Sequence, residues 1–204
     1  TYAGVTVYMT RNDNTSPNTD REQRAKFAAE KGANVLVSIH INSYGKGYTS
    51  AHGAEVYYPN SNYNSTVSGQ GQNLSAVILK QLTALGLADR GIKIINSKDG
   101  ETYPDGSLAD YLGINKYAKL YGYPGILIEH AYANNVSDAA NYLTTDAQLQ
   151  RLGVADATGI AQYFGLQKKK NVSLYGICKQ ETVEGISAAL SYSSDDSNIK
   201  FRWM

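Results

Sequence analysis

The chain has 204 residues, enough for one good-sized domain or for one domain and part of another. Its net charge of +1 gives no electrostatic footprint for nucleic acid, and no stretch reaches the roughly 18 consecutive apolar residues of a transmembrane helix. The single cysteine excludes an intrachain disulfide and a Cys-x-x-Cys metal site, so any bound metal ion must be held mainly by His and carboxylate side chains.

The first 166 residues alternate between strand-like and helix-like patterns. Val5–Met9 has the alternation of a strand, and Thr19-x-x-Glu22 has the form of a capping box that opens a helix through Lys31. This alternation predicts an α/β fold, a mainly parallel twisted sheet with helices on both faces. The later predicted elements are strands at 35–43, 53–58, 90–95 and 123–130, helices at 73–87, 111–121 and 145–164, a polar loop at 60–71 and a turn-rich loop at 99–107.

The pattern changes near residue 166. Lys168, Lys169 and Lys170 form a short basic cluster, which is more typical of a solvated linker than of a binding patch. Strand-like runs at 172–177, 188–192 and 199–203 follow, with polar turns between them. We therefore divide the chain into an α/β domain at 1–166, a linker at 167–170 and the truncated start of an all-β module at 171–204.

A histidine lies near the end of the second predicted strand. The segment Val35–Ser43 is mostly apolar and β-branched, which predicts a strand buried on both faces, and His40 lies toward its carboxyl end. Ligands collect at the carboxyl ends of strands in open α/β sheets, which makes His40 a candidate metal ligand. A lone histidine on an apolar strand is nevertheless more often a structural residue.

A second buried strand ends in a carboxylate. Ile126, Leu127 and Ile128 follow a Pro-Gly pair, and Glu129 comes next. Glu is rarely buried unless it is paired or binds something, so Glu129 is a candidate general base for metal-assisted hydrolysis beside His40. The alternative is a salt-bridged glutamate that faces solvent at the end of its strand. We expect the two side chains to open into one cleft.

Several motifs recur, in the same order, in one enzyme family. Over about residues 5 to 165 the chain resembles the zinc-dependent N-acetylmuramoyl-L-alanine amidases of the amidase-3 type, which cut bacterial peptidoglycan. The motifs are Thr10-Arg11, Arg24, Ser38-Ile39-His40-Ile41-Asn42-Ser43, Gly53–Tyr58, Arg90-Gly91-Ile92-Lys93 and Pro124–Asn135.

The resemblance implies a set of site residues. In this family zinc is held by two His and one Glu, and a second Glu acts on water. Carried over residue by residue, His40 becomes a zinc ligand and Glu129 the general base and acid, while Asn42 and Arg24 bind substrate or support the site. This chain departs from the family at its start, because the family's first strand and the following helix are not found in it.

The missing segments carry the other two ligands, which we expect before Thr1, so we expect this chain alone to be inactive. The two remaining histidines match no ligand position. His52 has the setting of a loop residue, and His130 is either a neighbour in the substrate groove or structural.

The resemblance also implies an activity and a location. The expected enzyme is a peptidoglycan hydrolase with Zn2+ as cofactor that cleaves the amide between N-acetylmuramic acid and L-alanine, in a bacterial protein that is secreted or at the cell surface. Its expected partner is peptidoglycan, with no nucleic acid and no membrane span. One alternative is a non-catalytic cell-wall-binding domain on the same fold. Another is a hydrolase of a different peptide or amide, because loops such as 60–71 hold most substrate contacts.

Overall fold

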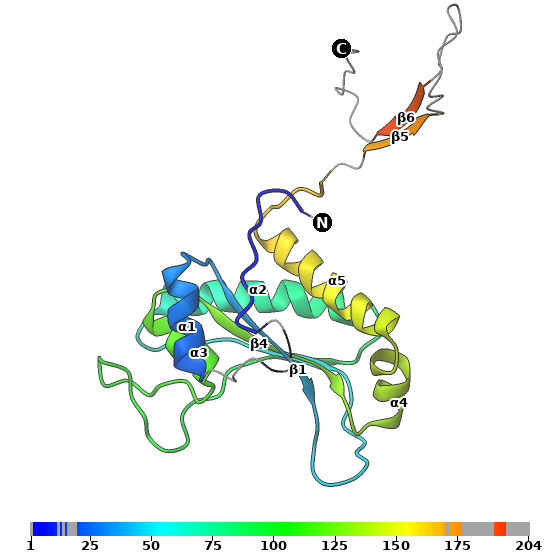
Figure 1. The fold of residues 1–204 in the computed structure, drawn as a ribbon. Helices are drawn as coiled ribbons and strands as arrows, with labels where there is room; N and C mark the ends of the chain where they lie inside the picture. Colours follow the sequence, from blue (N-terminus) through cyan, green and yellow to red (C-terminus); the bar gives the residue numbers. More distant parts are fainter. Residues whose placement is uncertain are drawn as a thin grey trace, which may run out of the picture. The chain divides into compact units, whose positions relative to one another are not determined.

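The structure is a computed structural model, and it describes residues 2–11, 13, 15, 20–169, 172–176 and 190–194. The chain divides into two compact units, one of residues Thr6–Gly165 and the other of Thr1–Val5 with Leu166–Met204. The larger unit contains a four-stranded sheet and the helices that cover it (Figure 1). Within the described ranges, no helix has the length and apolar character needed to cross a membrane.

The central sheet is mixed. Its strands lie in the order β1 (Leu36–Asn42), β4 (Gly125–Tyr132), β2 (Ala54–Tyr57) and β3 (Asp89–Lys93). β1 is parallel to β4 and β2 is parallel to β3, whereas β2 runs antiparallel to β4. The predicted mainly parallel sheet is therefore confirmed, with one antiparallel pairing that the local patterns did not reveal.

Helices cover both faces of this sheet, as the alternation predicts. α2 (Ser65–Thr83) and α5 (Asp146–Tyr163) pack together over the face that carries the apolar side chains of β2 and β4, such as Val56 and Ile128 (Figure 1). α1 (Arg21–Glu30) and α3 (Gly113–Leu120) contact each other and the opposite face. The sheet is thus the middle layer of the larger unit.

Gly125, at the start of β4, allows α3 to lie directly against the sheet. A Cβ atom built on Gly125 would lie 2.3 Å from the carbonyl oxygen of Ile114 and 2.7 Å from the Cβ of Ala118. Both distances are too short for a real side chain, so a larger residue would push α3 away from the strand. Only glycine fits at this close approach.

The connection from β4 to α5 ties two strands together. It contains α4 (Val136–Asp138) and a π-helical turn, η1 (Ala139–Leu143). The carboxylate of Asp138 accepts hydrogen bonds from the backbone N–H groups of Gly53 at 2.8 Å and Tyr132 at 2.9 Å, which joins the start of β2 to the end of β4.

α5, which corresponds to the helix predicted at 145–164, begins with a capping box. The side chain of Thr145 accepts a hydrogen bond from the backbone N–H of Gln148 at 3.2 Å, and the side chain of Gln148 accepts one from the backbone N–H of Thr145 at 3.0 Å. Each side chain satisfies a backbone donor that the first helical turn leaves open.

The start of the chain differs from its prediction. Residues 5–9 do not form a strand, and Tyr8 instead packs edge-on against Phe27 of α1, with ring centroids 6.4 Å apart. A strand needs a hydrogen-bonded neighbour, and no described strand pairs with this segment. Asp20 caps α1 by accepting from the backbone N–H of Gln23. Thr19, the predicted cap, lies outside the described residues.

Two further predictions are corrected in the sheet and its connections. β1 is the outer strand of the described sheet, and it is not buried on both faces, since Ile39 is 66% exposed. The predicted loop at 60–71 ends at Asn64, whose side chain accepts from the backbone N–H of Val67 at 3.1 Å. This cap starts α2 well before the predicted residue 73.

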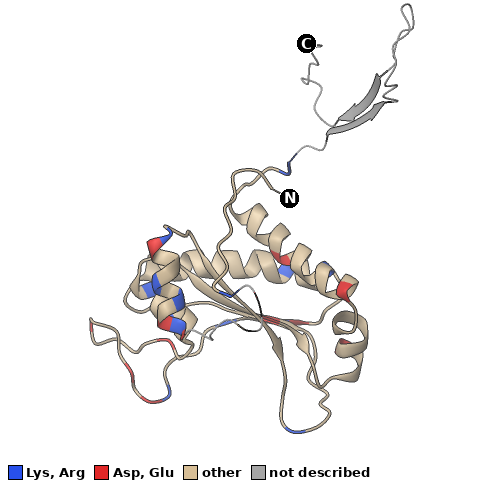
Figure 2. Cartoon of the chain, in the orientation of Figure 1, with Lys and Arg blue, Asp and Glu red and all other residues tan. Residues whose placement is uncertain are grey.

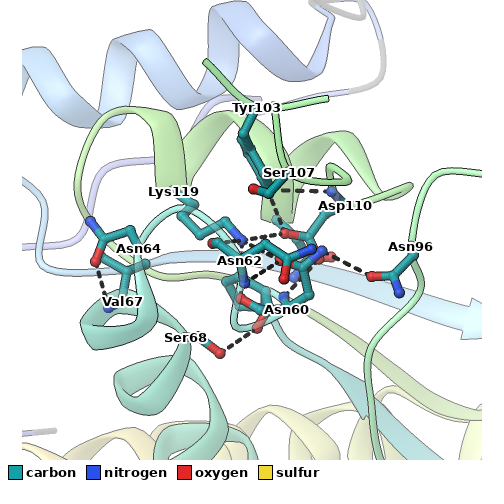
Figure 3. A network of polar contacts seen from close by, with 12 residues as sticks. Asn60, Asn62, Asn64, Val67, Ser68, Asn96, Tyr103, Ser107, Asp110 and Lys119 are labelled. Atoms are coloured by element: carbon teal, nitrogen blue, oxygen red, sulfur yellow. Dashed lines mark hydrogen bonds and ion pairs between the residues drawn. The ribbon is translucent and has the colours of Figure 1, made fainter. Parts of the chain in front are cut away.

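A buried polar network joins α3 to the segments around it. The side chain of Lys119 is 0% exposed, and its Nζ lies 2.9 Å from Asp110 Oδ2 (Figure 3). The same Nζ donates to the carbonyl oxygens of Asn60 and Asn62, each at 3.0 Å, and to Asn60 Oδ1 at 2.7 Å. The hydroxyl of Tyr103 donates to Asp110 Oδ2 at 2.5 Å. The buried charge of Lys119 is therefore matched by a carboxylate and three further oxygens.

The smaller unit contains an antiparallel pair of strands. β5 (Val172–Gly176) pairs with β6 (Leu190–Ser194), and the two overlap the strand-like runs predicted at 172–177 and 188–192. The third predicted run, at 199–203, lies outside the described residues. The division at 166 and 170 and the identity of residues 171–204 as an appended module stay predictions.

Candidate functional site

Three neighbouring strands place one titratable side chain each in a row across the sheet. His40 of β1 is the register partner of Glu129 of β4, and Glu129 is the register partner of Glu55 of β2. Register partners project from the same face of a sheet, so the three side chains share one face. Charged residues are otherwise found mainly on helices and loops, with few coloured segments inside the sheet (Figure 2).

A cavity of about 390 Å³ opens beside Glu129 on this face. It contains both signs of charge, since its lining includes Asn42, Glu55, Tyr57, Arg90, Lys93 and Glu129. His40 is not among the lining residues. The structure therefore confirms that His40 and Glu129 lie on neighbouring strands and the same face, but this cavity is not the cleft that the two side chains were predicted to share.

Glu129 has the properties of a proton acceptor. Its Oε2 atom is buried and has no hydrogen-bond partner among the described residues. Burial raises the pKa of Glu129, the negative charge of Glu55 raises it further, and the opposing effect of His130 leaves the pKa at about 7. A carboxyl group with a pKa near the working pH can both accept and return a proton. Glu129 was predicted to end its strand, but β4 continues beyond it to Tyr132.

Glu55 holds four of the cavity-lining side chains in place. Its side chain is only 4% exposed, and its Oε1 accepts hydrogen bonds from Asn42 Nδ2 at 3.0 Å and from the Tyr57 hydroxyl at 2.7 Å. Its Oε2 accepts from Arg90 Nε at 2.9 Å and from Lys93 Nζ. Burial raises the pKa of Glu55, but these hydrogen bonds outweigh burial and leave the pKa below its ordinary value. Glu55 is therefore a buried carboxylate that stays ionised.

His40 is electrostatically suited to the neutral form. It is an exposed residue, and its Nε2 lies 2.8 Å from Ser38 Oγ on the same strand. Partial burial of the ring lowers the pKa of His40, and the positive charges of Arg24 and Arg21 lower it further. The neutral imidazole is the form that binds a metal ion.

Of the other two predicted site residues, Asn42 lines the cavity and Arg24 does not. Asn42 ends β1, lines the cavity and donates to Glu55. Arg24 lies on α1, where its Nη1 is 3.5 Å from Thr10 Oγ1, and it does not line the cavity. The positive charge of Arg24 nevertheless contributes to the lowered pKa of His40.

The remaining histidines stand outside this row. His130 follows Glu129 along β4 and therefore projects from the opposite face, where it is 2% exposed. Its Nε2 lies 2.8 Å from Asp156 Oδ2 of α5 and its Nδ1 lies 3.0 Å from the carbonyl oxygen of His40. Of the two predicted roles for His130, these contacts support the structural one. His52 lies in a loop, with its Nδ1 2.9 Å from the Ser50 carbonyl oxygen.

A zinc centre does not fit the described residues by themselves. They include no group of three His, Cys, Asp or Glu side chains arranged to hold a metal ion. Catalytic zinc usually takes three protein ligands. His40 is accordingly a single candidate ligand in the part of the chain that the structure describes.

The sequence reasoning did not assign roles to Glu55, Arg90 or Lys93. Glu55 was part of a matched motif, and the available signal was its charge within an otherwise buried strand, since β2 is buried from Ala54 to Val56. Arg90 and Lys93 carried a weaker signal. Their spacing of three places them on opposite faces of a regular strand, and only the observed register brings them together.

Comparison with known proteins identifies a family. A family model described as N-acetylmuramoyl-L-alanine amidase matches residues 1–162. No curated protein sequence matches the chain. Among solved structures, the catalytic domain of CwlV, an N-acetylmuramoyl-L-alanine amidase from Bacillus (Paenibacillus) polymyxa var. colistinus, is 27% identical with a TM-score of 0.61, and the match covers 81% of this chain and 76% of that one.

Two other solved structures show how much of each relative is matched. Cwp6 from Clostridium difficile is 27% identical with a TM-score of 0.62, but the match covers 78% of this chain and only 22% of Cwp6. Ami1 from Mycobacterium smegmatis, an N-acetylmuramyl-L-alanine amidase, is similar in fold at 22% identity and a TM-score of 0.60, with 78% of this chain and 66% of Ami1 covered.

Proposed function

Because this chain belongs to the N-acetylmuramoyl-L-alanine amidase family, we propose that it acts in hydrolysis of the amide between N-acetylmuramic acid and L-alanine in peptidoglycan. The observation that carries the proposal is the position of Glu129, which lines a polar cavity and keeps one buried oxygen without a partner among the described residues. Peptidoglycan lies outside the bacterial cell membrane, so a bacterial source and a secreted or cell-surface location are part of the same proposal.

Glu129 carries the proton in this reaction. A water molecule attacks the carbonyl carbon of the scissile amide, and Glu129 Oε2 accepts a proton from that water. The carbon–nitrogen bond then breaks, and the same oxygen returns the proton to the leaving amine of L-alanine. Glu55 supports this step from the neighbouring strand, because it holds Asn42 and Tyr57 at the wall of the cavity.

We also propose that His40 is a zinc ligand. A bound zinc ion would polarise the carbonyl group and lower the pKa of the attacking water. His40 is the residue of this chain that we propose as a ligand, and its partial burial and the positive charges of Arg24 and Arg21 favour its neutral form. The described residues supply no complete ligand set, so no step above is assigned to the metal.

The first prediction tests Glu129 and His40 in the natural protein that contains this chain. Glu129→Gln keeps the size of the side chain but cannot accept a proton, so peptidoglycan hydrolysis should fall by about a hundred- to ten-thousand-fold. Its zinc content should stay near that of the unmutated protein. His40→Ala should lose zinc and activity together. The measurements are release of new amino groups from peptidoglycan and zinc content by elemental analysis.

Glu30→Gln is the matched control, because it makes the same chemical change at an exposed residue of α1. It should leave both readings unchanged. Full activity of Glu129→Gln contradicts the assignment of the base, and loss of zinc from it makes Glu129 a ligand. If the unmutated protein binds peptidoglycan without hydrolysing it, the non-catalytic binding domain is the correct alternative.

A further inference from the structure

Arg90 and Lys93 reach the cavity because of a bulge in β3. Ala54 pairs with Asp89 and Val56 pairs with Ile92, so Arg90 and Gly91 together oppose the single residue Glu55. Gly91 has φ of +87°, a left-handed conformation that glycine adopts without strain. The extra residue shifts the alternation by one, which brings Arg90 and Lys93 to the same face.

This bulge gives one wall of the cavity an excess of positive charge. Both cations bind Glu55, whose carboxylate carries a single negative charge. A guanidinium has five N–H donors and an ammonium has three, so each group can bind Glu55 and a further anion at the same time. The side chains are 32% and 35% exposed, which leaves them accessible from the cavity.

The two cations are also held in fixed positions. Glu55 is almost fully buried and anchors both of them, and the guanidinium of Arg90 lies 5.0 Å from the centre of the Tyr132 ring. Side chains that are already ordered lose less conformational entropy when a ligand binds. Arg90 and Lys93 are therefore preordered for binding, unlike mobile cationic side chains on an open surface.

We propose that Arg90 and Lys93 form a subsite that binds a carboxylate in the peptide part of the substrate. This inference rests on the proposed function. In that substrate the carboxyl group of muramic acid is consumed by the scissile amide, so a free carboxylate comes from the peptide.

Strand spacing sets where that carboxylate lies. Neighbouring strands are about 4.8 Å apart, so the backbone of β3 lies roughly 10 Å from that of β4, which carries Glu129. An extended peptide advances about 3.5 Å per residue. The carboxylate therefore belongs to one of the first few residues after the scissile amide.

The second prediction tests this subsite in the natural protein with zinc bound. The two probes are N-acetylmuramoyl-L-alanyl-D-glutamate and its diamide, in which both peptide carboxylates are converted to neutral amides. Charge-assisted hydrogen bonds to a carboxylate are lost with the diamide, so kcat/KM should be about tenfold or more higher for the acid form. Lys93→Gln and Arg90→Gln should bring this ratio close to one, mainly by raising KM for the acid.

Three comparisons separate binding from folding. Lys93→Arg keeps the charge and should keep most of the preference for the acid. Lys80→Gln, on the exposed side of α2, should behave like the unmutated protein. Lys93→Gln should lose a larger factor of kcat/KM on the acid than on the diamide, and its far-ultraviolet circular dichroism spectrum should match that of the unmutated protein, which shows that the variant is folded.

Two results would overturn the subsite. One is an equal kcat/KM for both probes with the unmutated protein, and the other is a Lys93→Gln variant that loses the same factor on both probes. If neither probe nor peptidoglycan is hydrolysed, the proposed function fails instead. Titration calorimetry with the two probes then decides the subsite, because tighter binding of the acid form supports it and equal binding overturns it.

Discussion

At the scale of single residues, Glu55 links the machinery of the cavity. It is the register partner of Glu129, and it accepts hydrogen bonds from Asn42, Tyr57, Arg90 and Lys93. A buried carboxylate is costly unless its charge is matched, and these donors match it. The same contacts order the side chains that a ligand would meet. Glu55 thus couples the stability of the fold to the geometry of the site.

The third prediction follows from the lowered pKa of Glu55. In the unfolded chain this carboxyl titrates near its ordinary pKa of 4.5, and in the folded protein it titrates at a lower pH. Its stabilising contribution is therefore fully present above about pH 4.5 and is lost as the pH falls through the folded pKa. Urea unfolding from neutral pH to about pH 3 should show a flatter acid limb for Glu55→Gln than for the unmutated chain. A Glu55→Gln limb as steep as that of Glu30→Gln would contradict this.

At the scale of elements, α3 is locked to its surroundings by the Lys119 network. The ammonium of Lys119 and the carboxylate of Asp110 are both buried, and Asn60 and Asn62 complete the oxygen shell (Figure 3). The segment between β3 and α3 contains Asp110 and supplies Leu112 to the cavity. This network therefore fixes the segment that contributes Leu112 to the wall of the cavity.

The fourth prediction compares two lysines on α3. Lys119→Met leaves the Asp110 charge buried without its partner and should lower the free energy of unfolding by about 3–5 kcal/mol. Lys116→Met removes a pair with Glu101, whose side chain is 58% exposed, and should cost no more than about 1 kcal/mol. Urea denaturation of both variants measures the difference. Equal losses would mean that the buried pair adds nothing beyond a surface pair.

At the scale of the whole molecule, the site lies where the helices leave the sheet uncovered. α1 and α3 pack against the starts of β1 and β4, and the row from His40 to Glu55 comes later along β1 and β4 on the same face. The opposite face is closed by α2 and α5, and His130 is bound there to Asp156. The face under α2 and α5 is therefore structural, and the candidate site lies on the other face, beyond the part that α1 and α3 cover.

The fifth prediction concerns metal content of the 204-residue chain. Its described residues offer His40 but no group of three ligands, so the purified chain should keep well under one zinc per molecule after dialysis. Elemental analysis provides the measurement, and His40→Ala should change the low value little. Zinc retained in a one-to-one ratio would show that the ligands have been misassigned.

The sequence by itself was sufficient for most elements and for placing two candidate site residues on neighbouring strands. Strand and helix periodicity and the Pro-Gly pair before β4 are local signals, and the structure contains the elements that they predict. His40 and Glu129 were chosen as candidates because a polar residue within an apolar run of sequence can be recognised without knowing its neighbours in space. Val5–Met9 was misread as a strand, because alternation cannot show whether a hydrogen-bonding partner exists.

Only the tertiary structure decided which residues share the site. β2 lies antiparallel beside β4, and this pairing places Glu55 next to Glu129, although no local pattern encodes strand order. The bulge at Gly91 then reverses the expected faces of Arg90 and Lys93. Strand order and register result from burying apolar surface across the whole sheet and from satisfying backbone hydrogen bonds. They are therefore properties of contacts between distant segments. Those contacts bring Glu55, Arg90 and Lys93 to the cavity that Glu129 lines.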